Sequence, residues 1–419
     1  MDIVALKSSS RSLNTKSLID RLLYTYFILL MAIETINGFA TYKGLFFIND
    51  LVVAGKLFIS ILSFTFIALN SEKILSRAMI LISIIFTQIF FHHLLSFDED
   101  LRTVNVALKI FFNFFSVYYI LHVLSNWDDG YKNVKRIILI NFCVITFNVY
   151  LGGAGIGFEN YKAADNTAIG GTGYLAAGNE VSIALLLAYS AMLIFYKHSP
   201  LKLALIIAVA SIASLLVLSK VTLLGISLVT IVFFFFLNKS LFMLFIAIAS
   251  TSLLLTYSSW IVYFQLAINR WTYLIRSYGI EAFILGGNKR VTYISDYLSN
   301  LAENPIILLS GVGWTGNPEN NLFDLIEAFG VIGIVLFLLF SFILLRPSHL
   351  ILAHFDSQLD KAVFKTHAIT SFLALAIMLL AGHAIQSSMI APFVGCFYAS
   401  SFLSTLSDRS RSISKRSLK

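Results

Sequence analysis

Several basic side chains fall within one polar stretch of this sequence, residues 263–319, which long apolar segments bound on both sides. They are Arg270, Arg276, Lys289 and Arg290. Lys and Arg bind phosphate and pyrophosphate through charge-assisted hydrogen bonds. Beside a bilayer, the anionic ligand that this pattern indicates is a lipid-linked phosphate. The alternative is that these cations only solvate a loop and contact lipid headgroups.

Other groups that could do chemistry lie inside the apolar segments. Glu34, Lys56 and Lys109 are charged residues within such segments, where charges are costly and have a functional or a paired role. For Glu34 the two readings are substrate contact and an ion pair with Lys56 that fixes two adjacent helices. His383 falls at the end of another apolar segment, where it is either an acid/base group or a neutral, packed side chain.

Motifs of soluble-enzyme chemistry are absent from the sequence. It contains no GxxxxGK[ST] phosphate loop, no HExxH and no Cys/His spacing typical of zinc. The two cysteines, Cys143 and Cys396, each lie in an apolar run and imply no disulfide framework. We therefore expect neither a metal nor a cofactor.

The composition indicates that membrane-spanning helices must position these groups. Of 419 residues, 58% are hydrophobic and only 12% charged, with a mean hydropathy of +0.84. Soluble domains carry roughly a quarter charged residues. A soluble enzyme, a disordered scaffold and a nucleic-acid-binding domain are excluded, so we expect lipids and not nucleic acid as partners. The sequence predicts an all-α polytopic membrane protein, with residues 1–419 forming one integral membrane domain.

The spacing of apolar runs predicts about twelve transmembrane helices, since each needs about 20 residues. Most of the 30 Lys and Arg fall in the tails and in alternate short loops, which predicts cytoplasmic N- and C-termini. Residues 153–179 and 263–319 are then outer-face loops, and residues 291–301 have the periodicity of a short amphipathic helix. The predicted spans are 22–41, 49–69, 78–97, 105–125, 137–152, 180–196, 203–219, 221–237, 240–262, 320–345, 362–382 and 385–405.

One segment resembles a known family. Residues 310–333 read SGVGWTGNPENNLFDLIEAFGVIG. They are similar to the bacterial O-antigen polymerase and ligase superfamily, in which a Gly-x-Gly turn ends a large periplasmic loop. A polar pair, here Glu319 and Asn320, then opens a helix ending in a Gly-hydrophobic-hydrophobic-Gly run.

Four further elements match the family in order. Gly178-Asn179-Glu180 resembles its entry to the sixth span, and Ser219-Lys220 its Ser-Arg junction. Arg270 through Leu274 fits an Arg-x-x-x-Leu element, and Gly287 through Arg290 resembles a Gly-Arg step before an amphipathic helix. The resemblance covers residues 170–345 well and the first half only through topology.

The resemblance implies a GT-C-like helical fold in a bacterial inner membrane, with the large periplasmic loop between the ninth and tenth spans. It also implies a metal-independent, inverting glycosyltransferase that polymerises undecaprenyl-pyrophosphate-linked oligosaccharides. A regulator of polysaccharide chain length is the implied protein partner. The pyrophosphate would be bound by Lys220, Arg270 and Arg290, with Arg276 in reserve, and Arg290 would act in catalysis. Glu319 stands at the base-like position, and its alternative role is a carboxylate favoured by a helix N-terminus.

The departures from the family pattern favour a polymerase over a ligase. Ligases carry His at the position of Glu319, whereas an acidic residue followed by Asp324 is more typical of polymerases. Lys220 stands where the family has Arg and lacks the bidentate fork. An O-antigen ligase that transfers polymer to lipid A-core remains one alternative. The other is a flippase or transporter of lipid-linked sugars, which should instead concentrate charge midway through matched halves.

Overall fold

The computed structural model describes residues 18–70, 72–94, 101–126, 129–162, 168–237, 257–285, 288–315, 320–345, 358–380, 383–387 and 389–417. Helices dominate these residues, together with one two-stranded sheet. The first eight helices are α1 (Leu18–Lys43), α2 (Phe46–Asn70), α3 (Glu72–Leu94), α4 (Leu101–Tyr118), α5 (Gly130–Gly153), α6 (Gly178–Phe195), α7 (Pro200–Val217) and α8 (Lys220–Leu237). The others are α10 (Tyr257–Leu285), α11 (Asn288–Glu303), α12 (Ile306–Ser310), α13 (Asn321–Phe329), α14 (Val331–Leu345), α16 (Gln358–Leu380) and α17 (Ala391–Ser417).

The prediction of a multi-pass helical membrane protein is confirmed. Within the described residues, eight helices are long and apolar enough to cross a membrane: α1, α2, α4, α5, α6, α7, α8 and α16. Two shorter apolar helices, 331–345 and 391–404, accompany them. The predicted ninth span, 240–262, lies mostly outside the described residues, so twelve spans remain a prediction.

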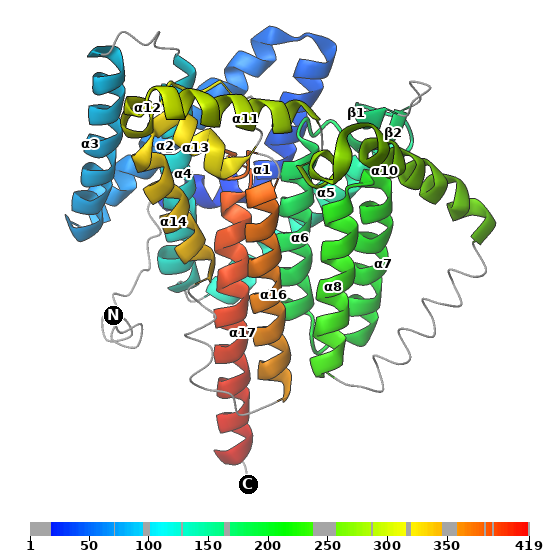
Figure 1. Cartoon of the computed structure of the whole chain (residues 1–419). Helices are drawn as coiled ribbons and strands as arrows, with labels where there is room; N and C mark the ends of the chain where they lie inside the picture. The colour runs from blue at the N-terminus through cyan, green and yellow to red at the C-terminus, as the bar shows by residue number, and fades with distance from the viewer. Residues whose placement is uncertain are drawn as a thin grey trace.

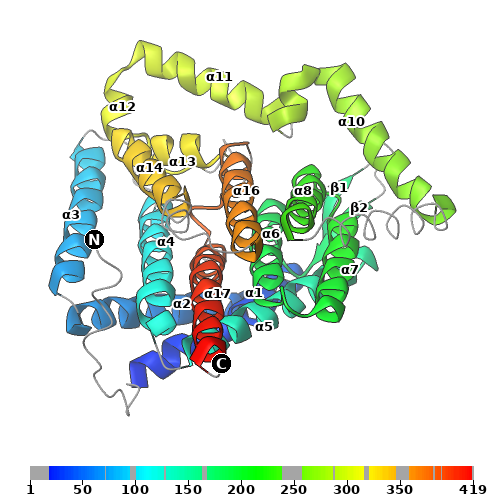
Figure 2. The same ribbon diagram turned by 90° about the horizontal axis from the view of Figure 1, so that it is seen from below.

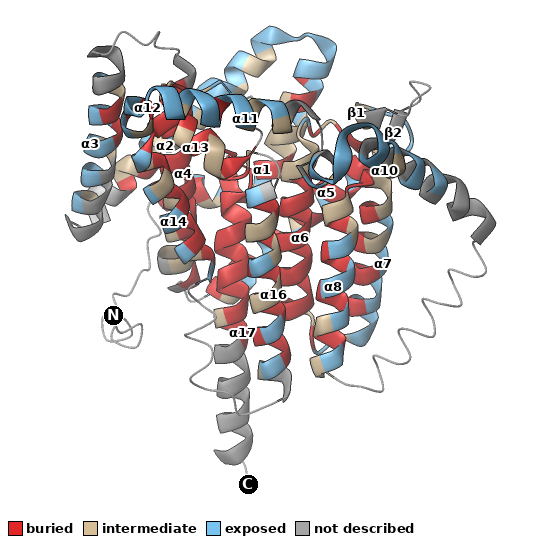
Figure 3. Cartoon of the chain, viewed as in Figure 1, coloured by how far each residue is buried: buried red, intermediate tan, exposed pale blue. Residues whose placement is uncertain are grey.

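Burial separates a central helix from a peripheral one. In α6, every residue from Val181 to Phe195 is buried, as expected for a helix that is apolar all round and surrounded by others. In α2, Leu51, Leu57 and Phe58 are exposed. Exposed apolar side chains on such a helix are suited to contact with lipid. Figure 3 shows the buried residues concentrated in the middle of the bundle, with mainly exposed residues on α10 and α11.

Short and amphipathic helices gather at one end of the bundle, which we call the α11 end. There α11 runs crosswise to the upright helices of the bundle (Figure 1). Viewed from below, α10, α11 and α12 run along one side of the bundle (Figure 2). The C-terminal end of α17 points away from the α11 end (Figure 1).

The predicted outer loop 263–319 is mostly helical where it is described. The helix predicted over 291–301 is confirmed and extends over all of α11. The α10 helix is kinked at Gly279, whose φ of 85° is easily reached only by glycine. After α11, Pro305 precedes the one-turn helix α12 and separates the two helices.

The other outer loop, 153–179, contains a β-hairpin that the sequence analysis did not predict. Strand β1 (Phe158–Lys162) pairs antiparallel with β2 (Ala168–Gly173), with Glu159 opposite Gly171. Half of the residues of β2, AIGGTG, are glycine, which is depleted in strands. Its glycines instead permit close packing on α5, because a Cβ on Gly171 would lie 2.6 Å from the carbonyl oxygen of Gly152.

Candidate functional site

Two asparagines fix α13 to the end of α16. Asn320 is the N-cap of α13, and its side chain accepts hydrogen bonds from the amides of residues 322 and 323 at 3.1 and 3.3 Å. The side-chain amides of Asn320 and Asn321 donate to the carbonyls of Leu379 and Met378. The last carbonyls of a helix have no partner within the helix, so these bonds satisfy the C-terminus of α16. Asn321 also accepts from the amide of Ile385 at 2.7 Å, which fixes the segment after α16.

The segment after α16 carries an imidazole held by a buried carboxylate. Nδ1 of His383 lies 2.8 Å from Oδ2 of Asp324, whose side chain is 0% exposed, whereas that of His383 is 29% exposed. Trp314 packs edge-on against the imidazole with a centroid distance of 5.1 Å. Because a carboxylate only accepts, Nδ1 carries the proton, and Nε2 of the neutral ring has the lone pair. This is the arrangement of a general base held in one tautomer by a carboxylate.

A second carboxylate lies near this pair. Glu180, in the first turn of α6, accepts a hydrogen bond of 2.5 Å from the hydroxyl of Ser387. It interacts electrostatically with His383 and with Lys109 of α4. We call Trp314, Glu180, Asp324, His383 and Ser387 the His383 cluster. Three segments far apart in sequence, around residues 180, 314–324 and 383–387, thus contribute to one polar site.

The prediction of an ion pair between Glu34 and Lys56 is confirmed. Their charged groups lie 2.8 Å apart between α1 and α2, and both side chains are largely buried. Glu34 also lies within electrostatic range of Glu180. The pair fixes two neighbouring helices beside the His383 cluster, which is the structural role the sequence offered as the alternative to substrate contact.

Glu327 connects α13 to α11 on the other side. The Thr315 hydroxyl donates to Glu327 at 2.6 Å, and the Tyr293 hydroxyl donates to the same carboxylate oxygen. Burial and this hydrogen bond raise the pKa of Tyr293, so its hydroxyl stays protonated. The amide of Val312 donates to the backbone carbonyl of Glu327 at 2.8 Å. Three segments therefore meet at one acidic residue.

Glycine spacing makes this packing possible. Gly311, with φ of 74°, ends α12, and a Cβ there would lie 2.6 Å from the carbonyl oxygen of Glu327. Gly330 has φ of 56° and lets the chain turn between α13 and α14. A Cβ on Gly333 would lie 1.9 Å from the carbonyl oxygen of Leu325. The Gly-x-Gly and Gly-hydrophobic-hydrophobic-Gly runs thus hold α12 and α14 tightly against α13.

The predicted cations lie at the α11 end in different surroundings. Lys220 opens α8, donates to the carbonyl of Phe283 on α10 and lies 3.8 Å from that ring's centroid. The predicted junction at Ser219-Lys220 is present, since α7 ends at Val217 and α8 begins at Lys220. Arg276 is exposed on α10, and Arg290 is partly buried in the first turn of α11. Their role towards pyrophosphate remains a prediction.

The side chains of two predicted site residues, Glu319 and Arg270, are not among those that the structure describes. Glu319, the base-like residue, is not among the described residues, and for Arg270 only the backbone in α10 is described. Asn320 lies beside the His383 cluster, where it positions α13.

The sequence analysis missed two carboxylates and two partners of the site. Glu180 entered it only as part of a motif, while Glu327, Trp314 and Ser387 were not singled out. A signal existed for Asp324 and Glu327, because both interrupt the apolar run NLFDLIEAFGVIG. Two acidic residues three positions apart in such a run lie on one helix face and need buried partners.

Comparisons with protein-family models, with curated proteins and with solved structures gave no match to this chain. The plain conclusion is a multi-pass helical membrane protein with a polar, titratable cluster at the α11 end.

Proposed function

We propose that this chain is a surface-polysaccharide polymerase of the O-antigen type. It would join undecaprenyl-pyrophosphate-linked oligosaccharide repeats at the outer face of a bacterial inner membrane. The observation that carries the proposal is the pairing of His383 with buried Asp324 at the α11 end of a membrane protein. The five sequence elements in family order and the cations of the outer loops add support.

The proposed chemistry is glycosyl transfer with inversion. An acceptor hydroxyl oxygen bonds to the anomeric carbon of the donor, while the bond from that carbon to the pyrophosphate oxygen breaks. Nε2 of His383 takes the hydroxyl proton, and Asp324 stabilises the resulting imidazolium. Undecaprenyl pyrophosphate leaves with the bonding electron pair on the opposite side of the ring. Attack in line with departure inverts the anomeric centre.

The leaving group requires positive charge. Lys220, Arg270 and Arg290, with Arg276 in reserve, are the proposed pyrophosphate contacts. Cations arranged in advance stabilise charge that develops in the transition state. The proposal invokes neither a metal nor a cofactor, and it includes a chain-length regulator as a partner.

Two residues compete for the role of general base. The family resemblance assigns it to Glu319, and the described geometry favours His383, because a carboxylate orients its imidazole. Glu319→Gln and His383→Gln separate the two, since the variant of the true base loses polymer formation and the other retains most of it.

The function is tested by deleting the gene in its own host and examining lipopolysaccharide by gel. In that gel, lipopolysaccharide molecules with different numbers of repeats form a ladder of bands. Collapse of the ladder to core plus one repeat supports the polymerase if the wild-type gene restores the full ladder. Polymer accumulating on undecaprenyl pyrophosphate would identify a ligase instead. Unpolymerised repeats trapped on the inner leaflet would identify a transporter, and an unchanged ladder would exclude all three in that host.

A further inference from the structure

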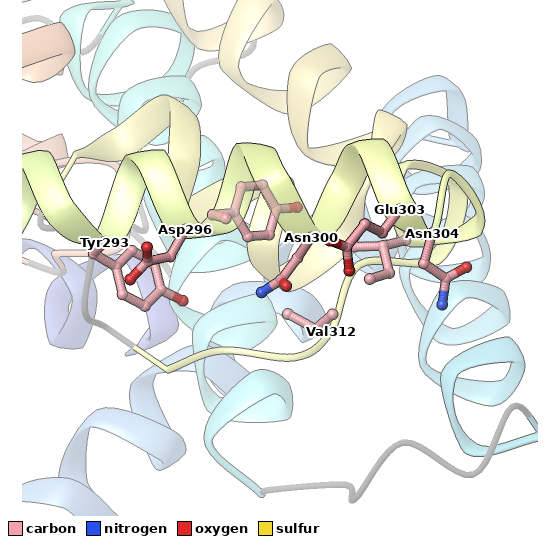
Figure 4. A pocket seen from close by; sticks show the side chains of 8 residues that line it. Tyr293, Asp296, Asn300, Glu303, Asn304 and Val312 are labelled. Atoms are coloured by element: carbon pink, nitrogen blue, oxygen red, sulfur yellow. The ribbon is translucent and has the colours of Figure 1, made fainter.

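An open pocket lies beneath α11, apart from the His383 cluster. Its volume is about 370 Å³, within the range of small-molecule sites. Side chains of α11 form one wall and the segment at Val312 forms the other (Figure 4). We call it the α11 groove; its lining residues are Tyr293, Asp296, Tyr297, Asn300, Glu303, Asn304, Ile307 and Val312.

The lining of the α11 groove disfavours an anion. Among the described residues that line it, the charged side chains are two acidic ones, Asp296 and Glu303. Two carboxylates repel a pyrophosphate by Coulomb's law, and the effect is strongest where water is excluded. The amides of Asn300 and Asn304 and two tyrosines complete the polar lining. Carboxylates, amides and tyrosines together offer donors and acceptors to a neutral ligand that has many hydroxyl groups.

One lining side chain has a buried polar group that the described residues leave unpaired. Tyr297 is only 6% exposed, and its buried hydroxyl has no hydrogen-bond partner among the described residues. A buried polar group without a partner costs about 1–3 kcal/mol, so a partner is expected there. Burial raises the pKa of Tyr297 to about 12, with Glu327 adding to the effect, and the group remains a neutral hydroxyl.

The α11 groove is joined to the His383 cluster through α13. Tyr293, which lines the groove, donates to Glu327. Asp324, which holds His383, lies three residues before Glu327 on the same helix, and residues at that spacing share a face. A chain seated in the groove would therefore lie beside the helix that positions the proposed base.

We infer that the α11 groove binds the neutral saccharide part of the substrate, in particular sugars of the acceptor chain, and not its pyrophosphate. The inference rests on the proposed polymerase function and adds to it a division of the substrate between two sites. Sugar hydroxyls would pair with the carboxylates and amides of α11 and with the hydroxyl of Tyr297. The cations of α8 and α10, together with Arg290 in the first turn of α11, would serve the pyrophosphate.

The test uses the full-length chain in lipid nanodiscs and two probes. One is the repeat oligosaccharide released by mild acid from the host's own lipid-linked pool, and the other is sodium pyrophosphate. Hydrogen exchange of residues 295–312 is followed during titration of each probe, because Arg290 at the start of α11 is itself a proposed pyrophosphate contact. The oligosaccharide should slow exchange there at least about threefold, because satisfied hydrogen bonds stabilise the segment, whereas pyrophosphate should not.

Matched variants decide which side chains bind. Tyr297→Phe keeps the ring and removes the hydroxyl, and Asn300→Ala removes an exposed amide. Each should raise the Kd for the oligosaccharide about three- to tenfold, the value of one hydrogen bond. Ser295→Ala changes an exposed residue of α11 that does not line the groove, and it should leave the Kd unchanged.

The groove and the function can fail separately. Protection of residues 295–312 by pyrophosphate, or equal Kd values for all three variants and the wild type, would overturn the inference. Normal polymerisation without protection of α11 by the oligosaccharide would do the same and leave the polymerase intact. If the oligosaccharide protects α11 but deletion of the gene leaves the ladder unchanged, the saccharide site would be supported and the polymerase function rejected.

Discussion

The His383 cluster and the α11 groove are both polar regions at one end of an apolar bundle, yet they differ in kind. The cluster pairs a fully buried carboxylate with an imidazole, and its members come from α6, from α13 and the segment before it, and from the segment between α16 and α17. The groove is open, acidic and lined mainly by one amphipathic helix. The first arrangement suits movement of a proton, and the second suits recognition of hydroxyl groups.

A single short helix serves both regions. Asp324 faces the cluster and Glu327 accepts bonds from Tyr293 and Thr315, so α13 couples the two. Variants in the two regions should therefore affect different kinetic constants. Changes in the cluster should lower kcat, whereas changes in the groove should raise KM with little effect on kcat.

The largest effect is expected at His383. His383→Gln removes the base and should lower the polymerisation rate about 10²- to 10⁴-fold, the usual contribution of general base catalysis. Rates are measured from repeat addition by membranes of equal protein content. The exposed His198 gives a matched control, and His198→Gln should retain full activity. Full activity of His383→Gln would remove the cluster from the chemistry.

Asp324 should rank next, as a positioning residue. Asp324→Asn keeps the shape but no longer selects the tautomer with hydrogen on Nδ1, and it should lower the rate about 10³-fold. Nitrogen-15 NMR of the His383 ring distinguishes this role from a structural one. A rate loss with an unchanged ratio of tautomers would contradict the proposed role of Asp324.

The ion pair beside the cluster should affect stability before activity. Lys56→Met removes the ammonium group that pairs with the largely buried Glu34 and should cost about 3 kcal/mol of unfolding free energy. The exchange Glu34→Lys with Lys56→Glu should recover much of that stability and retain polymer formation. Thermal unfolding in detergent gives the first result and the host ladder gives the second. A stable exchanged variant without polymer would instead place Glu34 in substrate binding.

The junction between the two regions should give the smallest effect. Gly311→Ala forces a side chain into a left-handed backbone against the Glu327 carbonyl and should cost about 2 kcal/mol. Gly55→Ala is the control, because a Cβ there meets nothing within 4 Å, and it should stabilise α2 by at most about 1 kcal/mol. Equal unfolding midpoints of the two variants would contradict the tight packing of α12 on α13.

The sequence predicted the features that depend on local pattern. The apolar runs, the amphipathic helix over 291–301 and the Ser219-Lys220 junction all follow from composition and periodicity, and the structure confirms them. The Glu34–Lys56 pair was predictable as well, because each buried charge requires a partner.

Features that depend on tertiary contact were not predictable. Asp324 and His383 lie 59 residues apart, and nothing local indicates that they meet. Ser387 and Glu180 are separated by 207 residues. The hairpin at β1 and β2 was missed because the glycines of β2 have low strand propensity. They allow β2 to pack closely on α5, and this tertiary contact is not visible in the sequence.

The central claim is that one chain both binds and joins lipid-linked repeats, using His383 as the base. The most direct measurement incubates the purified chain in nanodiscs with the host's undecaprenyl-pyrophosphate-linked repeat and follows product length and released undecaprenyl pyrophosphate together. The account predicts longer lipid-linked oligosaccharides, one undecaprenyl pyrophosphate released per repeat joined, and loss of both signals in His383→Gln. Bound substrate that is neither lengthened nor released by the wild-type chain would contradict it.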